Sequence, residues 1–274
     1  MGNKILVSVF DAERTAFEGL TALKDLHRDG DITLYASSVI AKDALGTVSV
    51  RQAEDPGPIG TLVGIVTGGL VGLLGGPAGV AVGAYVGGFG GLMYDLFQSG
   101  VSMDFVDEVS ASLIPGTAAV VADIDEMWMA PIDTRLGALG GTTFRRFPGD
   151  VIDAELIRET DAARAELEQL RSELRESSAE AKANVEKAID GQRHKLESLD
   201  DRIGKALAQQ DAEFQARLAT LREQQAKARE SQRQQIDARK AELKVSHEAR
   251  KAKLEEARRL AKESVEATRE ALVP

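Results

Sequence analysis

The chain has 274 residues, with 34 Lys and Arg, 44 Asp and Glu and no Cys, and its formal net charge is −10. This acidic balance argues against nucleic-acid binding, which depends on clustered basic side chains that neutralise phosphates. The absence of Cys excludes disulfides and thiolate chemistry and fits a reducing interior.

The charge distribution divides the chain near Asp150, because the residues before this point are strongly acidic and those after it are almost balanced. We therefore expect two regions, a front region with an insert and a tail. The predicted boundaries are 1–55 and 98–149 for the body, 56–97 for the insert and 150–274 for the tail.

The body contains short β-branched apolar runs, which predict strands, and apolar residues at helical spacing, which predict helices. The predicted strands are residues 4–10, 32–42, 47–53 and 117–124, with an edge strand at 142–147. The predicted helices are a segment that Asp11 caps and that ends at residues 29–31, residues 103–113 and residues 125–139. This order predicts an α+β fold with a ferredoxin-like βαββαβ body.

Glycine recurs at every fourth position within the insert, and no residue between Pro56 and Tyr94 is charged. Glycines four apart share one helix face and let another helix approach backbone to backbone. Because each interior glycine costs a helix about 1 kcal/mol relative to alanine, the pattern indicates a packing surface. The predicted self-association residues are Gly60, Gly64, Gly68, Gly72, Gly76, Gly79, Gly83, Gly87 and Gly91.

Residues 59–74 and 77–94 form two apolar segments on either side of a Gly-Gly-Pro turn and predict a helical hairpin. At helical rise they would be about 24 and 27 Å long, slightly short of a hydrocarbon core of roughly 30 Å. One interpretation inserts the hairpin into a membrane, although its acidic flanks oppose this. The other buries it between the subunits of a soluble oligomer, and both interpretations need self-association.

The start KILVSVFDAERTAFEGLTAL, the glycine run and the block from Trp128 to Arg146 together resemble a bacterial family of unknown function. Members of this family are often labelled uncharacterised membrane proteins. The resemblance covers roughly residues 3–147 and implies a ferredoxin-like body with a glycine-zipper insertion. It implies no reaction, because the family has no assigned catalytic residues, and the long tail departs from many of its members.

Three residues of the block after the fourth strand have two interpretations each. We expect Trp128 to pack under the helix over 125–139, rather than to serve as an exposed anchor for a partner. Arg145 and Arg146 would guard the edge strand or pair with local carboxylates, rather than contact anionic headgroups.

The tail lacks proline from Asp150 to Val273 and has helix-forming composition with apolar rows that repeat every eleven residues. An eleven-residue repeat predicts a nearly straight or weakly right-handed coil. The predicted coiled-coil residues are Leu174, Val185, Leu196, Leu207, Leu218, Leu221, Leu243, Leu254 and Val265.

The first part of the tail is acidic and the rest is basic, which favours antiparallel pairing within the chain or between subunits. Gly191 and Gly204 are candidate bends. A helix on a lipid surface and a solvated single helix are the alternatives to a coiled coil.

The sequence shows no catalytic, cofactor-binding or metal-binding pattern. His27, His194 and His247 are far apart, which makes a metal site unexpected. Carboxylates at the start of the second body helix, such as Asp104, are expected to favour the helix dipole rather than to do acid–base chemistry. We therefore expect no enzyme and no cofactor.

The favoured hypothesis is a cytoplasmic, non-enzymatic scaffold whose hairpins pack together in or on the inner membrane and whose coiled tails mediate assembly. Its expected partners are itself and membrane lipids, without nucleic acid or a small-molecule substrate. The alternative is a soluble homo-oligomer, a ring or filament, with the glycine zipper at subunit interfaces. A small-ligand sensor on the ferredoxin-like sheet is the third hypothesis and rests on fold analogy alone.

Overall fold

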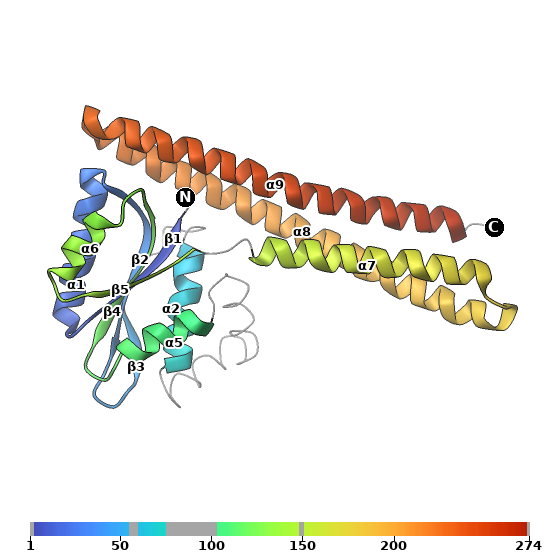
Figure 1. Cartoon of the computed structure of the whole chain (residues 1–274), viewed down its shortest axis with the longest axis horizontal. Helices are drawn as coiled ribbons and strands as arrows, with labels where there is room; N and C mark the ends of the chain where they lie inside the picture. Colours follow the sequence, from blue (N-terminus) through green and yellow to red (C-terminus); the bar gives the residue numbers. More distant parts are fainter. Residues whose placement is uncertain (1–2, 55–59, 75–102, 148–150, 273–274) are drawn as a thin grey trace. The chain divides into compact units, whose positions relative to one another are not determined.

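The computed structural model describes residues 3–54, 60–74, 103–147 and 151–272 (Figure 1). The chain divides into two compact units. The first unit comprises Met1–Val151 together with Glu213–Val245, and the second comprises Ile152–Ala212 together with Ser246–Pro274. The break at Val151 lies at the predicted boundary near Asp150, but a central piece of the tail, Glu213–Val245, belongs to the first unit.

The first unit is built on a five-stranded antiparallel sheet in the order β3-β2-β4-β1-β5. The strands are β1 (Lys4–Phe10), β2 (Ile32–Lys42), β3 (Val48–Glu54), β4 (Ala118–Glu126) and β5 (Thr142–Arg146). The predicted α+β class and the predicted strands agree with this sheet, and the bounds of β1 and β2 agree to the residue.

The order of the strands differs from the predicted ferredoxin-like one. In a ferredoxin-like sheet the third strand lies between the first and the second, whereas here β4 takes that place. Burial explains the exchange, because β4 is buried along almost its whole length while β3 exposes Arg51. A strand with a charged, exposed side chain suits the edge of a sheet. The split βαβ unit of β1 and β2 is kept.

Helices cover both faces of the sheet (Figure 1). Alternate residues of each strand point to opposite faces, so that Leu6 and Phe10 of β1 face one core and Ile5 and Val7 the other. The first core is closed by α1 (Glu13–Asp29) and α6 (Ala130–Gly137). The second is closed by α2 (Gly60–Leu74), α5 (Met103–Ser112) and residues of 213–245.

Three local predictions, about the cap of α1, the start of α6 and the packing of Trp128, are wrong. Ala12 rather than Asp11 is the N-cap of α1, and no side chain caps this end. β4 continues to Glu126, so α6 begins only at Ala130 and Trp128 lies in the connection, 65% exposed rather than packed. The sequence pattern of 125–139 is helical, but pairing with β2 keeps residues 125 and 126 in the sheet.

The helix α2 packs directly on the sheet through one face. Val63, Val66 and Leu70 are buried in the second core, and the Thr67 hydroxyl lies 2.5 Å from that of Ser38 on β2.

In the described part of the chain no helix combines the length and the apolar character needed to cross a membrane.

The tail consists of three helices, α7 (Val151–Glu176), α8 (Ala179–Lys227) and α9 (Glu230–Leu272). The chain turns at Ser177-Ser178 and at Ala228-Arg229. The predicted bends at Gly191 and Gly204 are wrong, because both glycines lie inside α8. A serine side chain can hydrogen-bond to nearby backbone groups in place of the helical hydrogen bonds, so Ser177 and Ser178 suit the end of α7.

Within the second unit α8 and α9 run antiparallel and pack with α7 around a common core. The basic residues Lys251 and Arg258 of α9 pair with Asp211 and Asp200 of α8, with N–O distances of 3.0 and 2.7 Å. The Arg258–Asp200 pair joins the acidic first part of the tail to its basic rest within one chain, which is the folded-back alternative of the sequence analysis.

Candidate functional site: the polar clasp

The region with the most buried polar chemistry lies where residues 213–245, here called the tip, cover the second core of the first unit. The tip comprises the end of α8, the turn at 228–229 and the start of α9. Leu221 and Ile236 of the tip are fully buried in the same core as Ile5 and Val7 of β1. Apolar packing thus brings the tip against the sheet, and the polar side chains around it determine how it is held.

Asp123 and Arg217 form a buried ion pair between β4 and the tip. Asp123 is fully buried, and the Arg217 guanidinium donates to both carboxylate oxygens at 2.6 and 3.3 Å. Burial alone would lower the pKa of Arg217, but the charge and hydrogen bonds of Asp123 raise it above the usual value. The arginine therefore stays charged inside the protein.

The ring of Tyr35 completes the surroundings of Arg217. Its centroid lies 4.5 Å from Cζ of Arg217, within the range of a cation–π contact. Tyr35 sits where the pairing of β2 with β4 shifts register, so this residue has no partner across the ladder. Burial, reinforced by the charge of Asp125, raises the pKa of Tyr35, and the phenol stays neutral.

Arg239 of the tip binds the turn between α1 and β2. Its guanidinium donates to the carbonyl oxygens of Gly30 and Asp31 at 2.7 and 3.0 Å and to the Thr33 hydroxyl at 2.9 Å. The turn exposes these carbonyls because Gly30 closes α1 in a left-handed conformation with φ of +82°. A cation at the C-terminal end of a helix is favourable for the helix dipole.

Gln224 makes complementary hydrogen bonds to the same turn. Its amide nitrogen donates to the carbonyl oxygens of His27 and Ile32 at 2.7 and 2.6 Å, and its amide oxygen accepts from Thr33 at 2.8 Å. We call the turn 27–33 together with Gln224 and Arg239 the clasp. Every polar atom of the Gln224 amide group is used in it.

His27 lies at the end of α1 inside the clasp. Its Nδ1 accepts a hydrogen bond from the backbone N–H of Leu34 at 3.1 Å, which requires a neutral ring at that nitrogen. Burial, and next the charge of Arg239, hold the pKa of His27 below its usual value.

A second polar cluster stands at the end of the β1–β5 pair. The carboxylate of Glu126 is fully buried and pairs with Lys4 at 3.1 Å and Arg145 at 2.7 Å. Arg145 also contacts Asp133, and Arg146 contacts Glu108 on α5. The prediction that Arg145 and Arg146 pair with local carboxylates is therefore confirmed.

The predicted self-association glycines fall into two groups. Gly60, Gly64, Gly68 and Gly72 lie on α2, and the remaining five, Gly76, Gly79, Gly83, Gly87 and Gly91, lie outside the described residues. A Cβ atom added to Gly64 or Gly68 would meet no described atom within 4 Å. Gly64 is exposed and Gly68 half-buried, whereas Gly72 is buried, so the open part of the glycine face lies at Gly64 and Gly68.

The predicted coiled-coil residues point into the cores of single units. Leu196, Leu254 and Val265 are buried in the second unit, where Leu174, Val185 and Leu207 pack against the same core. Leu218, Leu221 and Leu243 belong to the tip, in which the first two are buried and the third packs against the second core.

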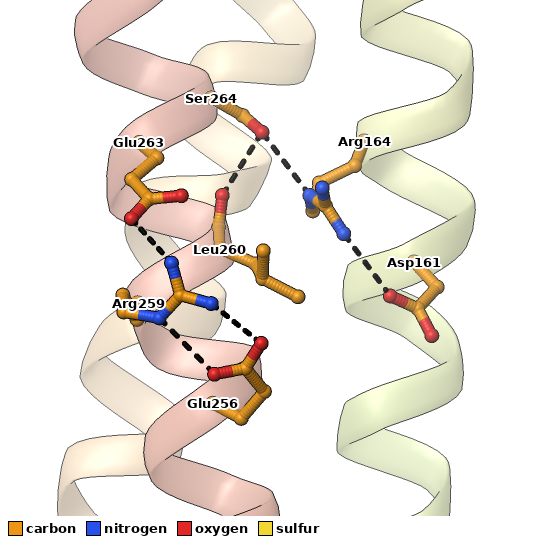
Figure 2. A network of polar contacts seen from close by, with 7 residues as sticks. All are labelled: Asp161, Arg164, Glu256, Arg259, Leu260, Glu263 and Ser264. Atoms are coloured by element: carbon orange, nitrogen blue, oxygen red, sulfur yellow. Dashed lines mark hydrogen bonds and ion pairs between the residues drawn. The ribbon is translucent and has the colours of Figure 1, made fainter.

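Polar contacts between the helices of the second unit are mostly part-buried, whereas those along α9 itself are exposed. Figure 2 shows Arg164 of α7, which donates to Ser264 of α9 at 3.1 Å, beside the Glu256–Arg259–Glu263 series along α9. Exposed pairs of this kind contribute little stability individually. A hollow of about 420 Å³ is lined by residues of α8 and α9. Charged side chains of its lining pair with each other, as Arg269 does with Glu197 at 3.3 Å.

The three histidines lie in different surroundings. His27 is in the clasp, His194 is exposed, and His247 lies 3.1 Å from Asp211. Within the described residues no cluster of His, Cys, Asp and Glu has the composition of a metal site.

The Asp123–Arg217 pair was not predicted from the sequence, although one signal pointed to it. Asp123 interrupts the apolar run 118–124 of β4, and a carboxylate at a core-facing position needs a partner. Its partner Arg217 lies 94 positions later in a segment with many arginines, and no local pattern distinguishes this one.

Residues 61–168 match the model of a family described as protein of unknown function (DUF1269). The match covers less than half of the chain and includes α2, α5, β4, α6, β5 and part of α7. It agrees with the expected resemblance to an uncharacterised family, although it begins after β3 rather than at residue 3. No curated protein and no solved structure matches the chain.

Proposed function

We propose that this protein is a non-enzymatic, self-associating scaffold in which the glycine face of α2 forms the contact between copies. One observation carries the proposal. α2 fixes one face to the sheet through Val63, Val66 and Leu70, while Gly64 and Gly68 face away from it. An anchored helix presents its free face at a defined place, and glycines on that face allow a second helix to approach closely.

The composition of α2 supports this role. The helix has no charged residue, so no side chain there would have to lose a charged hydration shell when two copies meet. Interior glycines lower the intrinsic stability of a helix, and packing on the sheet offsets this cost for α2. The soluble homo-oligomer of the sequence analysis is therefore our first choice, and membrane association is the second, favoured by the charge-free run between Pro56 and Tyr94.

Gly68→Leu tests the proposal. A Cβ atom added to Gly68 would meet no described atom within 4 Å, so we expect the variant to fold, whereas the larger side chain holds a second helix away from α2. We expect the variant to self-associate at least tenfold more weakly, measured by sedimentation equilibrium over a range of concentrations.

Gly191→Leu is the matched control, because Gly191 is also a helical glycine with open space around it but lies on α8. We expect it to behave as the unaltered chain. An unaltered chain that stays monomeric, or equal weakening by both variants, contradicts the proposal. Flotation of the same samples with liposomes distinguishes the second choice, which requires the unaltered chain to float.

A further inference from the structure

His27 is the clasp residue whose ordinary pKa, about 6.5, lies nearest neutral pH, and burial lowers this pKa. Its Nδ1 accepts the N–H of Leu34, and its carbonyl oxygen accepts from Gln224 of the tip. A protonated imidazole donates from both nitrogens and accepts from neither. Protonation at Nδ1 therefore breaks the bond to Leu34 and places an N–H against an N–H.

The charges that face His27 come from both helices of the tip. Arg239 of α9 and Lys227 of α8 oppose a positive ring, and Glu223 of α8 favours it. On α1 itself, the neighbouring Arg28 pairs with Asp25 at 2.8 Å. Two tip cations against one tip carboxylate leave a net repulsion for an imidazolium.

The helix dipole of α1 does not reverse this balance. A cation at a helix C-terminus is ordinarily stabilised by the last carbonyl groups. Here the guanidinium of Arg239 already binds the carbonyls of Gly30 and Asp31 at that end. A charged His27 would be a second cation at an occupied position.

We infer that the clasp is an acid-sensitive latch: a proton on Nδ1 of His27 loosens the turn 27–33 and releases the tip from the sheet. The inference goes beyond the proposed scaffold and does not depend on α2. Protonation first breaks the hydrogen bond from the Leu34 N–H to His27. The turn that carries His27 then moves, and Gln224 and Arg239 lose their hydrogen bonds to this turn.

We call the state with the tip held against the sheet docked. This state disfavours a positive charge on His27, and that determines the direction of the pH effect. The undocked state binds the proton more readily, so docking is complete above the ordinary histidine pKa of about 6.5 and weakens as pH falls from there through the docked pKa. One proton changes the docking equilibrium by at most about tenfold per pH unit. Burial raises the pKa of Asp125, which favours the docked state at lower pH, so the test belongs between pH 7.5 and 5.5.

The test uses amide hydrogen exchange of the full chain, with each rate divided by its intrinsic rate at the same pH. We expect Leu34 and residues 221–236 to lose up to tenfold protection between pH 6.5 and 5.5. His27→Asn places an amide oxygen where Nδ1 stands and does not titrate, so its protection should stay constant. His194→Asn, the same change at an exposed histidine of the second unit, should follow the unaltered chain.

Constant protection in the unaltered chain, or a parallel decrease in His27→Asn, overturns the inference. Titration of the His27 ring by NMR in the unaltered chain is the second measurement. This NMR measurement decides the question if the His27→Asn substitution itself opens the clasp at every pH. The latch requires protection to fall from about pH 6.5 and to stop falling at the pH where the ring titrates, and a fall that continues below the ring titration overturns it.

Discussion

At the scale of single residues, Asp123 is a buried charge that joins β4 to the tip. It is fully buried, and its negative charge faces a guanidinium that is itself removed from water. A buried pair of this kind contributes little net stability relative to apolar residues, but removal of one partner leaves an unpaired charge inside the protein.

We therefore expect Asp123→Asn to destabilise the first unit by about 3–5 kcal/mol, because Arg217 loses its counter-charge while its burial is unchanged. Hydrogen exchange of the β4 amides under increasing urea measures this unit specifically. Glu18→Gln is the control, since the Arg14–Glu18 pair is exposed and its loss should leave the β4 amides unchanged. Equal effects of the two substitutions would contradict the assignment.

Residues of this kind show what the sequence can and cannot predict about the site. The pairing of Arg145 and Arg146 with carboxylates was predictable, because the partners lie on neighbouring elements. The clasp was not predictable, because Gln224 and Arg239 contact a turn about 200 positions earlier in the chain. Such contacts depend on the path of the tail, which its helical periodicity does not determine.

At the scale of elements, the turn between α1 and β2 joins local backbone geometry to the tip. Gly30 adopts a φ of +82°, and a Cβ atom at this position would lie 3.1 Å from Cβ of Gln232. Both the conformation and the contact favour glycine at this position. A residue with a side chain is less stable by about 1–2 kcal/mol in the left-handed region, and its Cβ atom would crowd Gln232.

Gly30→Ala should consequently destabilise the first unit more than Gly46→Ala does. Gly46 has a similar φ of +87°, but a Cβ atom added there would meet only open space, so it carries the backbone cost alone. We expect about 1–2 kcal/mol for Gly46→Ala and a larger loss for Gly30→Ala, measured as urea midpoints by circular dichroism. A smaller loss at Gly30 would show that the tip does not press on the turn.

The hydrophobic pattern of the sequence predicts the bounds of individual strands but not their order in the sheet. β1 and β2 are long apolar runs with clear boundaries, and their predicted ends match the structure. The strand order was not predictable from the order of elements, because β3 and β4 are both able to pair antiparallel with β2. Burial decided between them, and burial is a property of the whole sheet.

At the scale of the whole molecule, α8 and α9 each contribute to both compact units, and α8 shows the consequence. Residues of α8 before 213 pack with α7 in the second unit, whereas those from Glu213 to Lys227 complete the core of the first. Regions that share a core open together in native-state exchange.

We expect residues 217–224 of α8 to exchange with the opening of the sheet, and residues 196–203 to exchange with α7. Native-state hydrogen exchange at rising denaturant, resolved by residue, measures both. Asp123→Asn should lower the opening free energy of 217–224 and leave 196–203 unchanged. A single opening free energy along the whole of α8 would contradict the division into units.

The position of the tip in the sequence has a consequence for synthesis. The last residue of β4, Glu126, leaves the ribosome long before the end of the tip at Val245, and translation of the intervening stretch takes about 6–24 s. During this interval Ile5, Val7 and Val121 have no tip to cover them. The nascent chain therefore carries an apolar sheet surface that α2 and α5 cover only in part for seconds, which makes this protein a candidate for chaperone assistance before its helices are complete.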